Sequence, residues 1–560
     1  MNFGRLLSLA SFAIAGALIV GCNGLEDRLD PQPKDARTAG QKITLSFDGD
    51  APASKAISAA GVKTFVPGDK ISVIYENTVG SLVRVVSDAL AADDIREEGR
   101  KADFTVTLTD PQPNGVLFYV YPADMVDDEL QMNYDALNTQ DGTLATIGRD
   151  LDLSIFQGEL TSEGKLPAAV TLQNYFALLE ISILNADASY DITKYTKNLT
   201  VSDGVNTYIV TPPAPASTFG AGPVYVLINP CVSFETLSFT TDGGITKEVS
   251  GHDLKAGHMY PIGLRLGEVI DLRAQTESDA DGFKHYTAHH GDVLCEEMYK
   301  GYVSIANGAT VTLSGTTIDS GDNCSHPVLG CLGDGTILLA KDTDIALQVG
   351  DSSFASGIYV PKGKTVTLGG EGSLYIDALN SYGAAIGGAY DSNAGKGIDC
   401  GTIIIEGGII DVDAGYEGAG IGSGSNATCD GIIIRGGFIK QSRGGDWAAG
   451  IGCGMNGICG DILISAGSIG GKFESWFYDG AVGGDYVAGI GCGEISTCGD
   501  ITIGPDITYI AACCGRDART AIGPSWFGEC GTVTVAPELE DTGDHDRWRF
   551  ITPATPEGDD

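Results

Sequence analysis

The stretch TIIIEGGIIDV, at Thr402–Val412, carries the pattern that decides the fold. Two short runs rich in isoleucine and valine stand on either side of a Gly-Gly pair. Such runs predict short β-strands with a buried face, and glycine permits the sharp corner between them. Related stretches begin 26 to 39 residues apart along the second half of the chain. The eight copies are TVTLSGTTI at Thr310–Ile318, TILLAKDTDI at Thr336–Ile345, TVTLGGEGSLYI at Thr365–Ile376, TIIIEGGIIDV at Thr402–Val412, GIIIRGGFI at Gly431–Ile439, DILISAGSI at Asp461–Ile469, DITIGPDIT at Asp500–Thr508 and TVTVAPEL at Thr532–Leu539.

Repetition at this period indicates stacked coils rather than one globular core. Each of the last five copies is preceded by an Ile-Gly element and a cysteine, so one repeat supplies about three short strands. This is the content of one coil of a parallel β-helix, in which each strand pairs with the coils above and below at about 4.8 Å. We therefore predict an all-β chain that contains a parallel β-helix of about eight coils at residues 301–540.

Composition excludes several classes of partner. The chain has 560 residues, 79 of them glycine, and a formal net charge of −40. This charge argues against binding to nucleic acid and against direct adsorption to anionic lipid, because both surfaces are negative. The length allows several domains, and the glycine content with few helical periods favours an all-β chain.

The first 22 residues, MNFGRLLSLASFAIAGALIVGC, predict export. A positive Arg5 precedes an apolar run at Leu6–Val20 that is too short for a comfortable membrane-spanning helix. The sequence Ile-Val-Gly-Cys resembles a bacterial lipobox, which implies removal of a signal peptide at residues 1–21 and acylation of Cys22. The alternative is an ordinary signal peptide with a chance cysteine. Residues 22–40 are polar and contain proline, as in a flexible tether.

Between Gln41 and Leu266 the repeat is absent and strand-like runs alternate with turn signals. Two β-sandwich domains are the natural interpretation, at residues 41–172 and 173–268. Residues 269–300 are polar and are interpreted as a linker, and residues 541–560 as an acidic tail.

The sandwich region resembles the fimbrillin-like proteins of Bacteroides. Four landmarks fall in that family's order: FVPGDKI at Phe65–Ile71, FYVYP at Phe118–Pro122, NYFALL at Asn174–Leu179 and LKAG at Leu254–Gly257. The resemblance implies a lipoprotein with two tandem β-sandwiches whose subunits form a pilus by strand exchange. Acidic residues directly after the lipid-bearing cysteine, here Glu26 and Asp27, resemble a surface-export signal and imply the outer face of the outer membrane.

Proteolytic maturation is a second implication of the resemblance. In related proteins an Arg-specific protease removes the N-terminal segment and opens a groove for a neighbour's strand, so Arg28 and Arg37 are candidate cleavage sites. The alternative is that both arginines are merely solvated. The β-helix after the second sandwich departs from the family's stalk subunits, which favours a tip or accessory subunit.

The cysteines leave three interpretations open. Cys453 and Cys459 are six residues apart, as are Cys492 and Cys498, and the two pairs occupy equivalent repeat positions. They form a buried ladder of thiols, disulfides between coils, or a metal site, of which the ladder is favoured. The adjacent Cys513 and Cys514 cannot both point inward on a regular strand.

No metal, cofactor or catalytic group is predicted. His285, His289, His290 and Cys295 lie close in sequence, but their spacing matches no usual zinc pattern. Asp411, Asp413, Asp430, Asp461 and Asp500 are interpreted as turn carboxylates, and no catalytic constellation of Asp with basic residues is evident. The enzymatic alternative is a polysaccharide lyase or hydrolase, since parallel β-helices host both.

Aromatic residues in the longest insertions favour binding of glycans or of host and partner surfaces, because aromatic faces stack on sugar rings. An aromatic cap over the coil edge is the alternative. The predicted function is a fimbrial tip or accessory subunit or adhesin at the cell surface, and a non-polymerising glycan-binding lipoprotein is the alternative within the same class. The candidate ligand-binding residues are Trp476, Phe477, Tyr478, Tyr486, Tyr390 and Trp447.

Overall fold

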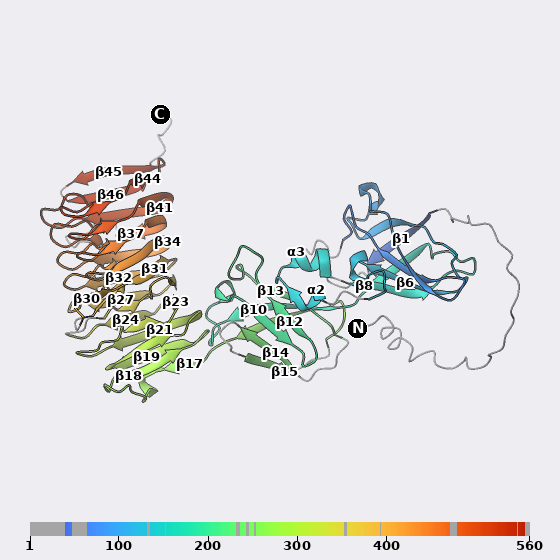
Figure 1. Cartoon of the computed structure of the whole chain (residues 1–560), viewed down its shortest axis with the longest axis horizontal. Helices are drawn as coiled ribbons and strands as arrows, with labels where there is room; N and C mark the ends of the chain where they lie inside the picture. Colours follow the sequence, from blue (N-terminus) through green and yellow to red (C-terminus); the bar gives the residue numbers. More distant parts are fainter. Residues whose placement is uncertain are drawn as a thin grey trace. The chain divides into compact units, whose positions relative to one another are not determined.

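The computed structural model describes residues 40–47, 64–131, 135–151, 153–230, 236–241, 246–250, 254–351, 355–391, 394–470, 479–545 and 547–554. The chain divides into two compact units, seen in Figure 1 as a blue-to-green part and a yellow-to-red part. The first unit comprises Met1–Ile183 and Thr196–Leu264, and the second comprises Leu184–Tyr195 and Arg265–Asp560. No helix among the described residues is long and apolar enough to span a membrane.

An eight-stranded sheet forms the first sandwich, in the order β3-β2-β6-β8-β9-β1-β5-β4. Its two halves pack on one core that includes Leu45, Tyr75, Phe104 and Tyr119. The first strand, β1, lies inside the sheet, antiparallel to β5 and parallel to β9. The strands are β1 (Gln41–Phe47), β2 (Ser72–Glu76), β3 (Leu82–Val86), β4 (Ile95–Arg96), β5 (Lys101–Val106), β6 (Val116–Tyr121), β8 (Ser154–Glu159) and β9 (Ala169–Asn174).

The second sandwich consists of a three-stranded sheet, β13-β10-β16, and a five-stranded sheet, β15-β14-β11-β12-β7. Two sandwiches were expected from the sequence, and this part of the fold class is confirmed. The strands are β7 (Thr139–Gln140), β10 (Ala177–Leu184), β11 (Leu199–Ser202), β12 (Thr207–Val210), β13 (Val224–Ile228), β14 (Thr236–Thr241), β15 (Thr246–Ser250) and β16 (Met259–Arg265). Short helical turns lie at η2 (Ala92–Asp94), η3 (Ala123–Met125), α2 (Asp135–Asn138), α3 (Leu144–Thr146), η4 (Ile147–Leu151), η5 (Thr193–Tyr195) and η6 (Leu272–Ala274).

The boundary between the sandwiches is not a single point near residue 172. Strand β7 pairs with β12 of the second sandwich before the chain returns to the first for β8 and β9. The Gln140 side chain accepts from the Leu227 backbone N–H at 2.9 Å and donates to its carbonyl at 2.8 Å. These two bonds pair the backbone N–H and carbonyl of Leu227 on the free edge of β13, where no further strand among the described residues is present to pair with them.

The second unit is a parallel β-helix with three faces, as the repeats predict. A 19-stranded sheet forms the first and second faces, and a nine-stranded sheet forms the third. Long strands such as β21 and β34 turn the corner between the first and second faces, since each pairs with two successive strands of the neighbouring coil. Figure 1 shows the strands stacked from β17 to β45.

The strands of the first and second faces are β17 (Val269–Asp271), β19 (Val293–Tyr299), β21 (Ala309–Asp319), β23 (Gly335–Leu339), β24 (Asp344–Gln348), β26 (Thr365–Gly370), β27 (Ser373–Ala378), β31 (Cys400–Ile405), β32 (Ile409–Ala414), β34 (Thr428–Arg443), β36 (Ile458–Cys459), β37 (Ile462–Ile469), β38 (Gly480–Val482), β40 (Thr497–Cys498), β41 (Ile501–Cys513), β43 (Glu529–Cys530), β44 (Val533–Val535), β45 (Leu539–His545) and β46 (Trp548–Pro553). The third face consists of β18 (Lys284–Ala288), β20 (Gly301–Ile305), β22 (Leu329–Cys331), β25 (Ile358–Tyr359), β28 (Ile386–Gly387), β33 (Ile421–Gly422), β35 (Ile451–Gly452), β39 (Ile490–Gly491) and β42 (Ile522–Gly523). A small hairpin of β29 (Ala389–Asp391) and β30 (Lys396–Ile398) protrudes between β28 and β31.

The β-helix begins earlier than expected. Residues 269–300, interpreted from their polarity as a linker, contribute β17, β18 and β19, which pair in parallel with the coils that follow. The nine strands of the third face therefore exceed the expected count of about eight coils. Polar residues in this first coil misled the sequence interpretation, because an end coil has only one neighbour and keeps a wetter surface.

The other end of the β-helix is closed by a hairpin. Residues after 540 were expected to be an acidic tail, but β45 and β46 form an antiparallel pair, and β46 lies antiparallel to β41. The apolar Ile551 is fully buried and Trp548 is 8% exposed. The hairpin covers the open edge of the last coil, which would otherwise template further strand pairing.

One segment from outside the repeats belongs to the β-helix unit. This segment, Leu184–Tyr195, leaves β10 and contacts several coils; we call it the strap. The strap bonds to the coils of β21, β23 and β31, so it connects these coils in addition to the strand pairing between neighbouring coils. Its contacts are Asn185 Nδ2 with Thr312 Oγ1 at 3.0 Å, Tyr190 Oη with the Leu339 carbonyl at 2.7 Å, and Lys194 Nζ with Glu406 Oε2 at 3.4 Å.

A column of glycines explains how the coils stack so closely on the third face. These glycines have φ between +121° and +140°, a region that side-chain-bearing residues rarely adopt. A Cβ atom at Gly452 would lie 2.1 Å from the Gly491 carbonyl oxygen. The Ile-Gly element is therefore required by the coil geometry. Its members are Gly387, Gly422, Gly452, Gly491 and Gly523.

We predict that Gly452→Ala destabilises the β-helix by at least about 1–3 kcal/mol, since it adds backbone strain and a collision with the next coil. Urea unfolding of the purified protein measures the change. The control is Gly363→Ala, where φ is +70° but no atom lies within 4 Å of the added Cβ. Equal losses for the two variants would contradict the role of close coil stacking.

Candidate functional site

The corner after the second face repeats a short polar motif in neighbouring coils. It reads Gly-Gly-Asp-Trp at Gly444–Trp447 and Gly-Gly-Asp-Tyr at Gly483–Tyr486. The preceding strands are in register, because Arg443 pairs with Val482 and Val482 with Cys513. Equivalent residues of successive coils therefore stand at about 4.8 Å along the stack.

Glycines bring the backbone of this corner inward. A Cβ on Gly484 would lie 2.0 Å from the Gly445 carbonyl oxygen, and one on Gly515 would collide with Gly484. Side chains are thus excluded from the floor of the corner, while the residues on either side keep theirs. The result is a groove that runs along the stack.

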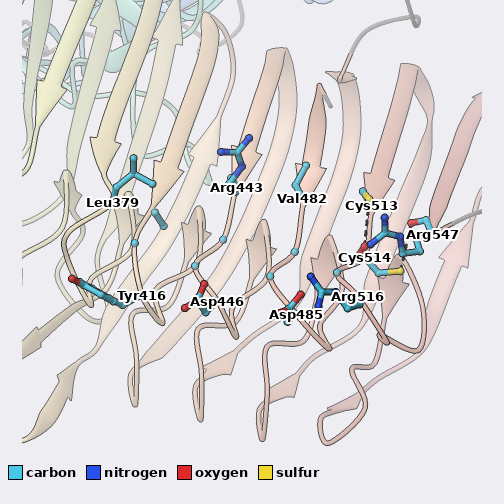
Figure 2. Close-up of a pocket in the computed structure, with 17 residues that line it drawn as sticks. Leu379, Tyr416, Arg443, Asp446, Val482, Asp485, Cys513, Cys514, Arg516 and Arg547 are labelled. Carbon is cyan, nitrogen blue, oxygen red and sulfur yellow. Dashed lines mark hydrogen bonds between the residues drawn. The ribbon is translucent and has the colours of Figure 1, made fainter. Parts of the chain in front are cut away.

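The groove has a volume of about 510 Å³. Leu379, Arg443, Val482 and Cys513 lie along one side of it, and Tyr416, Asp446, Asp485 and Arg516 along the other (Figure 2). Arg547 lies at the end beside Cys513 and Cys514 (Figure 2). The groove crosses several coils, so it is open to an extended ligand rather than to a compact one.

Charged side chains in the groove have free polar atoms. Arg443 pairs with Asp413 at 3.5 Å. The side chains of Asp446, Asp485, Arg516 and Arg547 are exposed and make no hydrogen bond or ion pair with any residue that the structure describes. Carboxylates accept and guanidinium groups donate, so the groove offers both kinds of hydrogen-bond partner to a ligand.

Exposed aromatic side chains flank the groove at the same corner. Tyr416 is 47% exposed, Trp447 37% and Tyr486 40%, and Trp526 on the adjoining loop is 61% exposed. The Trp526 backbone N–H donates to the Tyr486 carbonyl at 3.3 Å, which places this loop beside the corner. Isolated exposed aromatics are ordinary, but these four stand at or beside the corners of neighbouring coils, and Tyr416 among them lines the groove itself.

A tyrosine cluster extends this surface toward the preceding coils. The rings of Tyr382 and Tyr416 stack with centroids 4.9 Å apart, and those of Tyr382 and Tyr390 lie 5.4 Å apart. Tyr416 and Tyr486 have φ of +37° and +67°, which is uncommon for bulky residues. We call Tyr382, Tyr390, Tyr416, Trp447, Tyr486 and Trp526 the aromatic column.

Three of the predicted ligand-binding residues, Tyr390, Trp447 and Tyr486, belong to the aromatic column. Trp476, Phe477 and Tyr478 lie outside the described residues, as do Cys22, Arg28 and Arg37. The sequence analysis missed Asp446, Asp485 and Arg516. The signal was present in the two Gly-Gly-Asp motifs, whose alignment puts the aspartates one residue before Trp447 and Tyr486.

The aspartates considered for catalysis are engaged in the stacking of coils. Asp461 and Asp500 each accept a backbone N–H from the next coil, from Asp500 and Thr532 at 2.9 and 2.7 Å, and Asp430 accepts that of Gly363, two coils away, at 2.8 Å. Asp411 pairs with Lys440 at 2.7 Å, and Asp413 accepts from Gln441 at 2.8 Å. Asp430, Asp461 and Asp500 therefore bind backbone N–H groups as turn carboxylates do, whereas Asp411 and Asp413 lie on β32 and pair with side chains of the next coil.

The histidine-rich stretch also has structural contacts. Asp292 is buried and accepts from the backbone N–H groups of Glu268 and His289 at 2.9 and 2.8 Å. The buried His290 accepts at Nδ1 from the Thr310 backbone N–H at 3.1 Å. Within the described part of the chain, no group of three or more His, Cys, Asp or Glu side chains is arranged to hold a metal ion.

The repeat cysteines form a ladder of thiols inside the β-helix. Each pairs in register with the next: Cys400, Cys429, Cys459, Cys498 and Cys530. All cysteines among the described residues are free, and burial raises the pKa of the Cys400 thiol. Of the adjacent pair, Cys514 joins the main core and Cys513 packs against Trp548 outside it.

No family model matches the chain, and no curated protein matches it. Solved structures do match part of it. The chain is similar to fimbrial proteins. Three of these structures are a fimbrial assembly protein from Parabacteroides distasonis (14% identity, 40% of this chain and 90% of that chain, TM-score 0.23), a fimbrial protein from Bacteroides ovatus (12%, 45% and 54%, 0.22) and the tip fimbrial protein Mfa3 from Porphyromonas gingivalis (14%, 38% and 81%, 0.17).

These matches agree with the fimbrillin-like resemblance expected from the sequence. Identities of 12–14% and TM-scores of 0.17–0.23 describe a partial likeness and carry no argument about function. The function therefore has to be argued from the groove and the aromatic column.

The contacts of Asp399 predict that the stability of the β-helix depends on pH. Asp399 accepts from Lys362 Nζ at 2.6 Å and from the Thr428 backbone N–H at 2.8 Å, and the Lys362 hydrogen bond holds the pKa of Asp399 below its ordinary value of 3.8. A depressed pKa stabilises the folded state above the ordinary pKa, and this stabilisation is lost as the pH falls through the folded-state pKa.

We predict that Asp399→Asn lowers the free energy of unfolding by about 1 kcal/mol at pH 7 and that the difference shrinks as the pH falls below the ordinary pKa of 3.8. Urea unfolding at several pH values measures both. Asp344→Asn, at an exposed position without a recorded partner among the described residues, should leave the pH dependence unchanged. A constant difference between wild type and Asp399→Asn across this range would contradict the prediction.

Proposed function

We propose that this protein is a cell-surface adhesin, a fimbrial tip or accessory subunit whose β-helix binds a glycan along the groove. The observation that carries the proposal is the aromatic column, which lies at the corners of successive coils beside unpaired polar side chains. Sugar rings present apolar faces to aromatic planes and hydroxyls to carboxylates and guanidinium groups, so the groove offers what a glycan needs.

The geometry favours an extended glycan. Equivalent side chains repeat at about 4.8 Å, close to the length of one sugar residue in an extended chain. Asp446 and Asp485 stand at equivalent positions in neighbouring coils, and so do Trp447 and Tyr486. A glycan that lies along the stack would therefore meet a similar set of groups at each sugar.

Attachment to the cell is proposed to depend on Cys22. An acylated cysteine followed by a polar tether would hold the sandwiches and the β-helix outside the outer membrane. Association with other fimbrial subunits by strand exchange is part of the proposal, since an incoming strand gains backbone hydrogen bonds at a sheet edge.

The position of β1 bears on this association. β1 begins at Gln41, after both Arg28 and Arg37, and is hydrogen-bonded to β5 and β9. Cleavage at either arginine would therefore leave β1 in its sheet and would not open a groove there. This favours an accessory or tip position over a stalk subunit that depends on removal of this strand.

We predict that Trp447→Ala and Tyr486→Ala each weaken glycan binding about tenfold, because each removes one stacking surface worth about 0.5–1.5 kcal/mol together with its apolar contact area. A glycan array followed by calorimetry on the best ligand measures the change.

Tyr299→Ala is the matched control, since Tyr299 is 56% exposed and lies on β19, away from the corner motifs. Undiminished binding by both groove variants, with unchanged melting temperatures, would exclude the aromatic column as the binding surface. Reducing or unsaturated ends released from a polysaccharide would instead identify a β-helix enzyme.

The anchor makes a separate prediction. The intact mass of protein from washed cells should correspond to a chain that begins at an acylated Cys22. The Cys22→Ser variant should be absent from the membrane fraction, because the acyl chains supply the membrane affinity. A mature start after Arg28 or Arg37 in sheared high-molecular-weight material would contradict a stably anchored form and would point to a polymerised one.

A further inference from the structure

The arginines of the groove recur at a particular interval. Arg443 stands at the end of β34, and its in-register neighbour in the next coil is Val482. The coil after that contributes Cys513 on this side and Arg516 on the other, with Arg547 beside them. Among the described residues that line the groove, arginine is therefore present in the coil of Arg443, absent from the coil of Val482 and present again in the coil after that, at about 10 Å from the first.

Basic side chains elsewhere on the β-helix are mostly neutralised by contacts between coils. The ion pairs between coils are Lys341 with Glu371, Lys362 with Asp399, Lys364 with Asp334, Arg435 with Glu406 and Lys440 with Asp411. Arg549 pairs with Asp541 within the terminal hairpin. Arg516 and Arg547 have no such partner among the described residues, although the whole chain has a net charge of −40.

An unpaired guanidinium group is a specific recognition element. Its planar fork of donors fits the two oxygens of a carboxylate, and such charge-assisted pairs are stronger than neutral hydrogen bonds. Asp446 and Asp485 project into the same groove and would repel an acid group placed beside them. A ligand with a carboxylate on every sugar would meet these aspartates, whereas one that alternates acid and neutral sugars need not.

We propose, on the basis of the glycan-binding function above, that the groove binds a linear glycan in which a uronic acid alternates with a neutral sugar. One uronate carboxylate lies at the unpaired Arg516 and Arg547, and the other lies at Arg443, whose exposed guanidinium group keeps further donors beside its 3.5 Å ion pair with Asp413. The neutral sugar between them lies over the coil of Val482 and donates its hydroxyls to Asp485. Two coils then correspond to one disaccharide of the ligand.

The test uses oligosaccharides of hyaluronan and of unsulfated chondroitin, which alternate glucuronate with a neutral amino sugar, and the same oligosaccharides after reduction of their carboxyl groups. The full-length protein should bind at least one acidic form at least tenfold more tightly than its reduced form. Because exposed charges are screened, this preference should decrease from 50 to 300 mM salt.

Two substitutions test whether the groove arginine, rather than a nearby arginine, binds the carboxylate. Arg516→Gln should weaken binding of the acidic oligosaccharide about tenfold and leave the reduced form unchanged. Arg519→Gln, three residues away and outside the groove lining, is the matched control and should bind as the wild type does. Both arginines are exposed, and the melting temperature of each variant reports whether the fold is intact.

The outcomes distinguish this inference from the function on which it rests. Equal affinity for acidic and reduced forms, with loss of both in Trp447→Ala, would overturn the inference and leave glycan binding in place. Binding only to sulfated chondroitin, or to a polyuronate with an acid on every sugar, would also overturn it. Absence of binding to every oligosaccharide, neutral ones included, would overturn both proposals.

Discussion

In-register pairing between parallel coils is the constraint on which the β-helix depends. Every coil must supply apolar side chains to the interior at the same positions, as Ile403, Ile432, Ile462 and Ile501 do on the first face. The third-face glycines allow consecutive coils to approach closely enough for this pairing. The cysteine and aspartate ladders follow from the same register, because any residue kept at one repeat position is stacked on its equivalents.

The groove is a consequence of this register as well. Glycines that remove side chains from one corner leave a channel, and the residues before and after them become its two walls. The scaffold and the groove therefore use the same repeat. Changes such as Asp446 for Tyr416, or Trp447 for Glu417, alter the chemistry of one coil without altering the stacking. This separation lets the walls carry charge and aromatic rings while the interior stays apolar.

The repeat made the β-helix predictable from the sequence, because strand content and period are local properties. The first coil and the terminal hairpin were missed for a physical reason. The ends of the β-helix have a neighbouring coil on one side only, so their sequences depart from the repeat and resemble a polar linker or tail. The excursion of β7 into the second sandwich was also hidden, since it depends on the contact of Gln140 with Leu227, 87 residues away. For the candidate site, aromatic content alone pointed to Trp447, Tyr486 and Tyr390, which stay a prediction. The charged residues of the groove could not be found in this way, because they come together only when the corners of successive coils align in space.

The strap has a mechanical consequence for the β-helix. Hydrogen bonds between coils run along the stack, so tension in that direction would break them at one coil boundary after another. The strap leaves β10 and bonds to the coils of β21, β23 and β31 at once. Force applied to the strap would therefore be shared among these coils rather than carried by one of them.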